Sequence, residues 1–399
     1  MQRSAAAVVL LAVAGLVATT ATASAKSTAR AAAKGSIPVA LVSDFTGALA
    51  PSTGVQGALA YFHWLNAHGG VDGHKITVKQ YDAGSSPTTA LQAFRRAIAA
   101  KPAAILESAS GEEISSLSAV TSSGIPVVDD GFAPGWIDKP TLFSPVGDVS
   151  THLSDVWLTV LKHFGHATKV AVIGSSLETG DLKLLAKSGP DVGVKVVMTD
   201  LSEPETLTSA QALTLAEQIK SSGANGVSVI GVLAINQLQA DLNQLGVKVT
   251  VADPVFESDA QFGKTIDGEL FAEDWASPYV KNNAGIKAYL AAMKSAGYGS
   301  VAYSAGFAPF RYAQAEMLVQ EGLKKAGAPF SHKAVIKALS GVKNWTANGI
   351  LAPVSFPQFQ QVGIHCLSVM KVVNGKWVPE TNGNHPFVCG GPSTKTPGT

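Results

Sequence analysis

The stretch Asn66-Ala67-His68-Gly69-Gly70-Val71-Asp72-Gly73 decides how the first part of this chain folds. It is a glycine-rich turn between residues 57–67, whose apolar positions recur at helical spacing, and residues 76–81, which alternate as a strand does. Another strand is predicted at 37–43, so the order is strand, helix, strand. Both strands deliver the loops that follow them to the same edge of a parallel sheet, where open α/β sheets bind their ligands.

The alternation of strands and helices continues along the chain. Residues 87–100 are predicted as a helix, 103–106 and 125–128 as strands, and Ser110-Gly111-Glu112-Glu113 as a capping box that opens the helix between them. This series predicts a parallel sheet with right-handed crossovers. A second series of helices and strands in a similar order predicts a second, similar lobe. Its elements are predicted at 156–164, 169–173, 181–187, 194–198, 210–221, 227–230, 236–245 and 249–251.

The last third of the chain departs from this pattern. Helices are predicted at 284–295, 310–325 and 333–339, and they come too late to extend the second lobe. The dipeptide Asn374-Gly375 then lies between the largely apolar run 367–373 and Trp377, which is the strongest short signal for a β-hairpin.

The composition is that of a globular protein. Of the 399 residues, 46 % are apolar and 15 % are charged, and the formal net charge is +1. A chain of this length can bury a large core and is expected to form two domains. The chain lacks the excess of positive charge that is typical of nucleic-acid-binding proteins, so no nucleic-acid partner is expected.

The N-terminus has the pattern of a secretory signal peptide. Arg3 supplies a positive charge, residues 5–17 are apolar, and Ala23-Ser24-Ala25 is a cleavage site of the small-x-small type. The alternative is a membrane anchor, but a span needs roughly 20 apolar residues. We therefore expect cleavage near Ala25 and an exported protein, either periplasmic or held at the cell envelope or outside it.

The chain has two cysteines, Cys366 and Cys389. Export favours a disulfide, which would close a short C-terminal loop. The alternative is a pair of unbonded thiols. Their spacing matches no metal motif. His163 and His166 have no evident third ligand, so no metal and no cofactor are predicted.

The pattern Asn-Ala-x-Gly-Gly-Val-x-Gly at 66–73, then a strand, then Asp-x-x-x-Ser-Pro at 82–87, resembles the periplasmic branched-chain amino acid (Leu/Ile/Val)-binding proteins, the solute-binding proteins of ABC transporters. The resemblance implies an α/β fold of two doubly wound, Rossmann-like lobes with parallel sheets, joined by a three-segment hinge, the type I periplasmic-binding architecture. The crossovers would fall near 147–150, 275–278 and 349–353. The implied division is signal peptide 1–25, linker 26–35, lobe 1 at 36–147 plus 279–348, lobe 2 at 148–278 plus 349–390, and a disordered tail at 391–399.

The resemblance also implies the ligand-binding loops of lobe 1. The first is Ser108-Ala109-Ser110, which opens a helix whose N-terminal N–H groups can hold a carboxylate. The alternative is that Ser110 only caps the helix. The second loop is Gly131-Phe132-Ala133. Asp44, Asp129 and Asp130 are further candidates for an amine, and the alternative for these three is exposed loop acids.

In lobe 2 the sequence departs from the family pattern. The matching ligand positions are Thr179, Val232 and Glu257. The resemblance implies an aromatic ring near the first two, which this sequence lacks, and an acidic residue near the third. A desolvated ammonium needs a carboxylate, and Glu257 is the candidate. If Glu257 points away, a carboxylate, an amide or an uncharged apolar ligand is expected instead.

The resemblance therefore implies a monomeric solute-binding protein for amino-acid transport that captures a small organic molecule and presents it to a membrane permease. No nucleophile elbow, phosphate loop or dinucleotide fingerprint is present, so no catalytic residue and no enzyme activity are predicted. Two alternatives remain. One is a ligand sensor of the same fold, and the other is a secreted hydrolase.

Overall fold

A computed structural model provides the structure of the chain. It describes residues 34–47, 57–108, 115–129, 139–146, 155–175, 179–204, 207–230, 232, 235–253, 263–300, 302, 308–357, 365–381 and 386–390. The predicted signal peptide, most of the linker 26–35, the capping box at 110–113 and the tail 391–399 lie outside these residues. The first strand begins at Lys34, inside the predicted linker.

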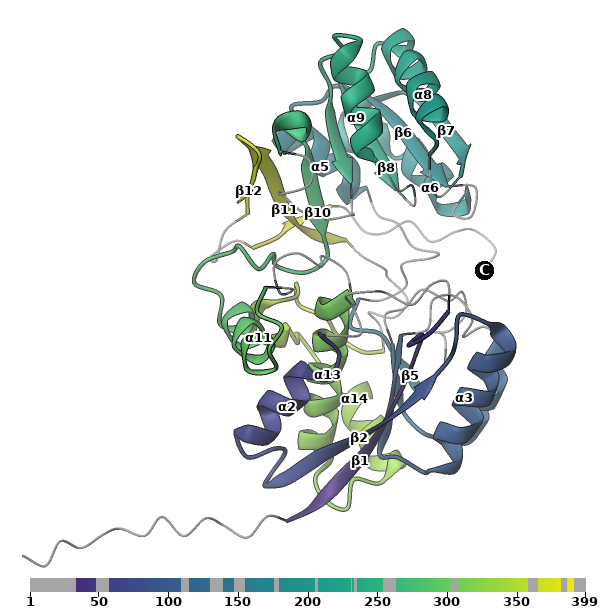
Figure 1. Cartoon of the computed structure of the whole chain (residues 1–399), viewed down its shortest axis with the longest axis vertical. Helices are drawn as coiled ribbons and strands as arrows, with labels where there is room; N and C mark the ends of the chain where they lie inside the picture. The colour runs from purple at the N-terminus through teal and green to yellow at the C-terminus, as the bar shows by residue number, and fades with distance from the viewer. Residues whose placement is uncertain are drawn as a thin grey trace, which may run out of the picture. The chain divides into compact units, whose positions relative to one another are not determined.

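The first sheet is parallel throughout, with strand order β2-β1-β3-β4-β5 (Figure 1). Its strands are β1 (Lys34–Ser43), β2 (His74–Asp82), β3 (Ala104–Ser108), β4 (Val127–Val128) and β5 (Leu142–Phe143). The helices between them are α2 (Ala60–Ala67), α3 (Pro87–Ala99) and α4 (Leu117–Ser123). Three late helices pack into the same core, namely α11 (Ala284–Ser295), α13 (Ala308–Ala326) and α14 (His332–Ser340). We call this sheet with these six helices lobe 1.

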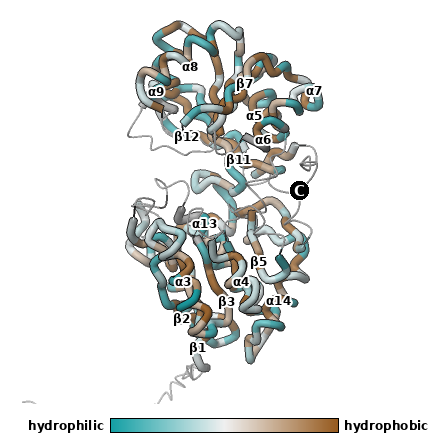
Figure 2. Tube along the Cα trace, turned by 90° about the vertical axis from the view of Figure 1, so that its right-hand side faces the viewer, coloured by the Kyte–Doolittle hydropathy of each residue, from teal (hydrophilic) through white to brown (hydrophobic). Residues whose placement is uncertain are grey.

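The inner strands β1, β3 and β4 are largely buried on both faces, which is why they are largely apolar, whereas most residues of the edge strand β2 are exposed or half-buried. Successive side chains of a strand point to opposite faces. Ile37, Val39 and Leu41 accordingly pack with α2, α11, α13 and α14, whereas Ala40 and Val42 pack with α3 and α4. Strand β3, in the interior of this sheet, is largely hydrophobic in Figure 2.

The second sheet has the strand order β12-β11-β10-β9-β8-β6-β7, and β13 pairs with β11 (Figure 1). The strands are β6 (Lys169–Ser175), β7 (Lys195–Glu203), β8 (Gly226–Ile230), β9 (Thr250–Asp253), β10 (Leu270–Glu273), β11 (Cys366–Val373), β12 (Lys376–Pro379) and β13 (Val388–Cys389). The helices on it are α5 (Val156–Gly165), α6 (Thr179–Lys187), α7 (Gly189–Val192), α8 (Ser209–Ser222) and α9 (Ile235–Gln244). We call this sheet with these helices lobe 2.

The two sheets share one topology. Counted in chain order within each lobe, the five parallel strands are arranged 2-1-3-4-5 in both. This is the doubly wound order whose crevice lies where the strand order reverses. The predicted α/β class with two lobes is confirmed. The lobe boundaries given above stay a prediction.

The strands β5 and β10 do not appear among the predicted elements. They contain two and four residues. An apolar run this short carries no usable periodicity, so only pairing with a neighbouring strand identifies it.

The predicted hairpin and disulfide are both present. Val373 pairs with Lys376, and the intervening Asn374 and Gly375 have φ of 56° and 72°, the left-handed pair that a tight hairpin turn needs. Cys366 is bonded to Cys389, which ties β13 to β11. Thus the disulfide expectation is confirmed and the alternative of unbonded thiols is wrong. None of the helices that the structure describes is long and apolar enough to cross a bilayer.

Candidate ligand-binding site

The sheet topology indicates the edge of each lobe at which a ligand is expected to bind. In lobe 1 the strand order reverses between β1 and β3, whose last residues, Ser43 and Ser108, are register partners. In lobe 2 it reverses between β6 and β8, which end at Ser175 and Ile230. Ligands of open α/β sheets bind outside the carboxyl ends of the strands at such points. These two edges therefore form the candidate site.

Asp82 joins the two loops at the edge of lobe 1. Its Oδ1 accepts hydrogen bonds from the backbone N–H groups of Phe45 at 3.0 Å, Thr46 at 3.1 Å and Gly84 at 3.0 Å, and its Oδ2 accepts from Thr46 Oγ1 at 2.5 Å. Slight burial raises the pKa of Asp82, but the hydrogen bonds from Thr46, Gly84 and Phe45 outweigh it and hold the pKa below its ordinary value. The carboxylate is thus a structural clasp between the loops after β1 and β2.

A second contact reinforces this clasp. Asp44 Oδ1 accepts from the backbone N–H of Ser85 at 2.6 Å. Gly47, at φ of 103°, lies so close to the second loop that a Cβ there would be 2.6 Å from Ser85 Oγ and 2.7 Å from Gly84 O. Only glycine combines this backbone conformation with this close approach. The contacts of neither aspartate were evident from the sequence.

The carboxyl edge of lobe 1 is also rich in buried polar side chains. Ser43, Asp44, Glu107 and Asp129 are at most 2 % exposed. The Ser43 hydroxyl is hydrogen-bonded to the phenol of Tyr312 from α13. The alternative that Asp44 and Asp129 are exposed loop acids is therefore wrong, because both are buried within the edge. Asp130 lies outside the described residues.

The predicted ligand residues fall at these edges where the structure describes them. Ser108 is the last residue of β3, and Thr179 is the first residue of α6, which follows β6. Val232 follows β8, is 1 % exposed and packs in the core of lobe 2. The remaining predicted ligand residues lie outside the described residues, namely Ala109, Ser110, Gly131, Phe132, Ala133 and Glu257. The roles of all nine stay predictions.

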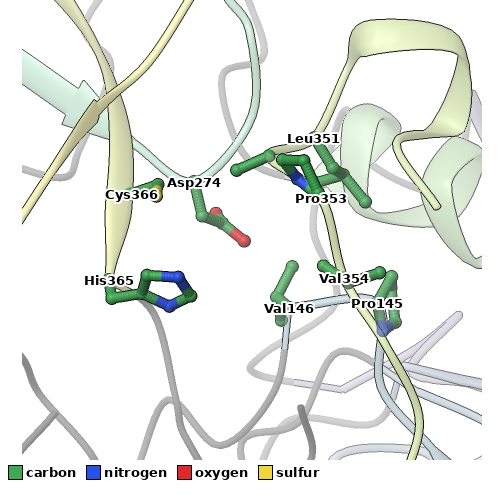
Figure 3. A pocket seen from close by; sticks show the side chains of 9 residues that line it. Pro145, Val146, Asp274, Leu351, Pro353, Val354, His365 and Cys366 are labelled. Carbon is green, nitrogen blue, oxygen red and sulfur yellow. The ribbon is translucent and has the colours of Figure 1, made fainter. Parts of the chain in front are cut away.

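The crossovers between the lobes meet at a small cavity (Figure 3). Four segments line it, namely the residues that follow β5, those that follow β10, residues 351–354 and the start of β11. The lining includes Val146, Asp274, Leu351 and Cys366. Asp274 and His365 point into it (Figure 3). Its volume is about 20 Å³, enough for about one water molecule. It is therefore too small to hold an organic ligand.

A buried charge cluster lies beside this cavity. Arg311 Nη2 of α13 is 3.4 Å from Asp274 Oδ1, and the guanidinium carbon is 4.9 Å from the centroid of the Trp275 ring. Glu273, next to Asp274, is 4 % exposed. Burial, with the Asp274 charge, raises the pKa of Glu273 well above its ordinary value. Burial also raises the pKa of Asp274, although Arg311 opposes this. The cluster thus links α13 of lobe 1 to the crossover that leaves β10 of lobe 2.

Two of the crossover segments run side by side at this point. Trp275 forms an antiparallel bridge with Leu351, and the backbone N–H of Ala276 donates to Ile350 O at 2.6 Å. In the described part of the chain, no cluster of three or more His, Cys, Asp or Glu side chains could hold a metal ion.

Comparison with known proteins agrees with this architecture. The family model described as "Periplasmic binding protein" matches residues 36–376. The chain belongs to the periplasmic binding protein family. Comparison with curated protein sequences gave no match.

Solved structures with the periplasmic binding protein fold cover nearly the whole chain. The substrate-binding protein of an ABC transporter from Aeropyrum pernix has 18 % identity and a TM-score of 0.67, over 92 % of this chain and 97 % of its own. A leucine-binding protein from Thermotoga maritima has 17 % identity and a TM-score of 0.66, over 87 % and 99 %. A branched-chain amino acid ABC transporter protein from Thermus thermophilus, with bound valine, has 17 % identity and a TM-score of 0.68, over 88 % and 96 %. At these identities the likeness establishes the fold alone.

Proposed function

We propose that this chain is the extracytoplasmic solute-binding protein of an ABC importer, and that it captures a small organic molecule between its two lobes by hinge closure. The observation that carries the proposal is the doubly wound order repeated in two lobes whose crossovers meet at one place. Family membership supports solute binding and an extracytoplasmic location. The mechanism is binding without chemistry, and the closed form is presented to a membrane permease.

The ligand class that we propose is an amino acid, an amide or a carboxylate. Several solved relatives are branched-chain amino acid proteins, one of them with bound valine. Ser108 and Thr179 lie at the edges where the strand order reverses, which supports a ligand held from both lobes. Closure removes the ligand from water, so that each hydrogen bond to it counts for more.

A thermal-shift screen of amino acids, amides and carboxylates tests the proposal. A ligand at ~100 times its Kd adds about 2.7 kcal/mol to the free energy of unfolding. At roughly 2–4 °C per kcal/mol for a chain of this size, this raises the Tm by several degrees. Small-angle scattering with and without the hit checks closure, and we expect a smaller radius of gyration with ligand.

The screen also separates the alternatives. Turnover of a hit, measured as product formation at catalytic protein concentration, would refute the proposal in favour of a hydrolase. A hit that closes the lobes but gives no uptake in permease-containing vesicles would favour the ligand sensor. If leucine, isoleucine and valine fail while an acid without an amine binds, the role predicted for Glu257 is wrong.

A further inference from the structure

Lobe 1 contains a cavity much larger than the one at the crossovers, and none of the residues described above at its carboxyl edge lines it. The cavity lies between α2, the second half of α13 and the turn at 343–348, and its volume is about 560 Å³. Small-molecule sites typically occupy roughly 300–1,000 Å³ and combine an apolar or aromatic lining with a few polar groups. The size alone therefore admits a ligand of one or two rings.

The floor of the cavity is apolar and firmly packed. Tyr61, Leu65, Met317 and Ala347 are each at most 5 % exposed. Because these side chains belong to the main core of lobe 1, the floor is part of the fold and needs no ligand to form.

The walls are aromatic. The indole of Trp64 is partly exposed, and its ring centroid lies 4.3 Å from that of His68 with an angle of 35° between the planes. His68 Nδ1 is 2.7 Å from the backbone oxygen of Trp64, which fixes the orientation of the imidazole ring. Trp345, also partly exposed, is held in place by reciprocal backbone hydrogen bonds of 2.9 Å with Val354. Two indoles and an imidazole thus present ring surface to the cavity.

The rim is positively charged. It carries Lys324, Lys325 and Lys343 against the single acid Glu321. Lys325 Nζ is paired with Glu321 Oε1 at 3.0 Å, and Lys343 Nζ donates to Phe356 O at 2.8 Å. Within the described residues Lys324 takes part in no ion pair, and its side chain is exposed. Two positive charges are therefore not balanced by an acid of the rim.

Amide groups complete the lining. Tyr61 Oη donates to Gln320 Oε1 at 2.6 Å, so the donor group of Gln320, its Nε2, is left for another partner. The side chains of Asn344 and Asn348 are exposed on the turn. Together the cavity offers ring faces, hydrogen-bond donors and ammonium groups.

We propose that this cavity is a second ligand site, separate from the inter-lobe site, and that it binds a small molecule in which a six-membered ring carries a carboxylate. The ring packs against the indoles of Trp64 and Trp345, and the carboxylate is attracted to Lys324 and Lys343. Aromatic acids and sugar acids share this chemistry. The site depends on lobe 1 alone and does not rest on the function proposed above.

Isothermal titration of the full chain with 4-hydroxybenzoate and with glucuronate tests the proposal and distinguishes the two sources. We expect one of these acids to bind with one-to-one stoichiometry, and its uncharged counterpart, 4-hydroxybenzamide or glucose, to bind at least tenfold more weakly. Lys324→Glu should weaken binding of the acid at least tenfold. Lys294→Glu is the matched control, because Lys294 is an exposed lysine in the last turn of α11 that does not line the cavity.

Three results would overturn the proposal. In the first, neither acid binds the unmodified protein. In the second, Lys324→Glu and Lys294→Glu weaken binding equally, so that net charge explains the effect. In the third, Lys324→Glu leaves the affinity for the acid unchanged, which means that the acid binds elsewhere. Failure of the inter-lobe proposal is distinguishable, because a hit from the thermal-shift screen should bind the Lys324→Glu variant with unaltered affinity.

Discussion

Glu316 connects α13 to the start of α2, and this contact predicts an unusual dependence of stability on pH. Its two carboxyl oxygens accept from the backbone N–H groups of Leu59 at 2.8 Å and Phe62 at 2.6 Å. The N-cap residue of α2, Leu59, makes no side-chain capping hydrogen bond, so Glu316 supplies the cap from a distant part of the sequence. Glu316 is fully buried, and burial raises its pKa to about 8 although the two backbone hydrogen bonds lower it.

The magnitude follows from this pKa. Below pH 4.5, the ordinary value for Glu316, the folded and unfolded chains both hold the proton. Between pH 4.5 and 8 the folded chain keeps a proton that the unfolded chain has released, so the free energy of unfolding falls as the pH rises. At about 1.4 kcal/mol for each unit of pKa shift, the stability lost across this window is about 5 kcal/mol.

Glu316→Gln tests this prediction, because glutamine does not titrate in this range. Glutamine satisfies one of the two N–H groups and leaves the other unpaired, at a cost of about 1–3 kcal/mol. The variant should therefore be less stable than the wild type at pH 5 and more stable at pH 9. Urea denaturation at pH 5, 7 and 9 gives the free energy of unfolding of both proteins. In the difference between the two proteins at each pH, the contributions of the other titrating groups cancel.

Glu321→Gln is the matched control, since it removes a carboxylate from the same helix at a partly exposed position. Its stability difference from the wild type should vary little between pH 5 and 9. If the Glu316→Gln difference is also constant, or if the variant loses more stability at pH 9 than at pH 5, Glu316 is ionised in the folded protein and the reasoning fails.

Two further predictions concern the loop clasp and the disulfide. Gly47→Ala should destabilise the protein about 1–3 kcal/mol more than Gly69→Ala. Both glycines have φ above 100°, but only at Gly47 would the added Cβ clash with Ser85. Equal losses of Tm in the two variants would refute the close-contact explanation. Replacing Cys366 and Cys389 by alanine opens a loop with a sequence separation of 23 and should cost about 3 kcal/mol in urea denaturation. The wild type under reducing conditions should show the same loss, and a double variant as stable as the oxidised protein would contradict this.

Most of the fold could be predicted from local pattern. The strand at 37–43 and the helix at 57–67 lie close to the observed β1 and α2, because alternation and helical spacing are carried by neighbouring residues. The turn at Asn374-Gly375 likewise follows from the left-handed conformation that these residues adopt readily.

Long-range contacts could not be predicted in this way. The sequence shows Asp82 within a loop motif, but not that it accepts hydrogen bonds from residues near 45. It shows Glu316 as an acid in a helix, but not that this acid caps another helix. The cavity beside Trp64 joins residues near 64, 320 and 345, and no spacing along the chain brings these together. Such sites depend on how the elements pack, which local periodicity does not specify.

The main core of lobe 1 has a consequence for the order in which the chain can fold. One face of β1, with Ile37, Val39 and Leu41, is covered largely by helices that begin at Ala284 and end at Ser340. A growing chain therefore synthesises most of lobe 2 before it has the helices that cover β1. Loop closure over this separation is slow compared with the pairing of neighbouring elements. Lobe 1 is first in the sequence, yet it can reach its native state only after most of the polypeptide has been made.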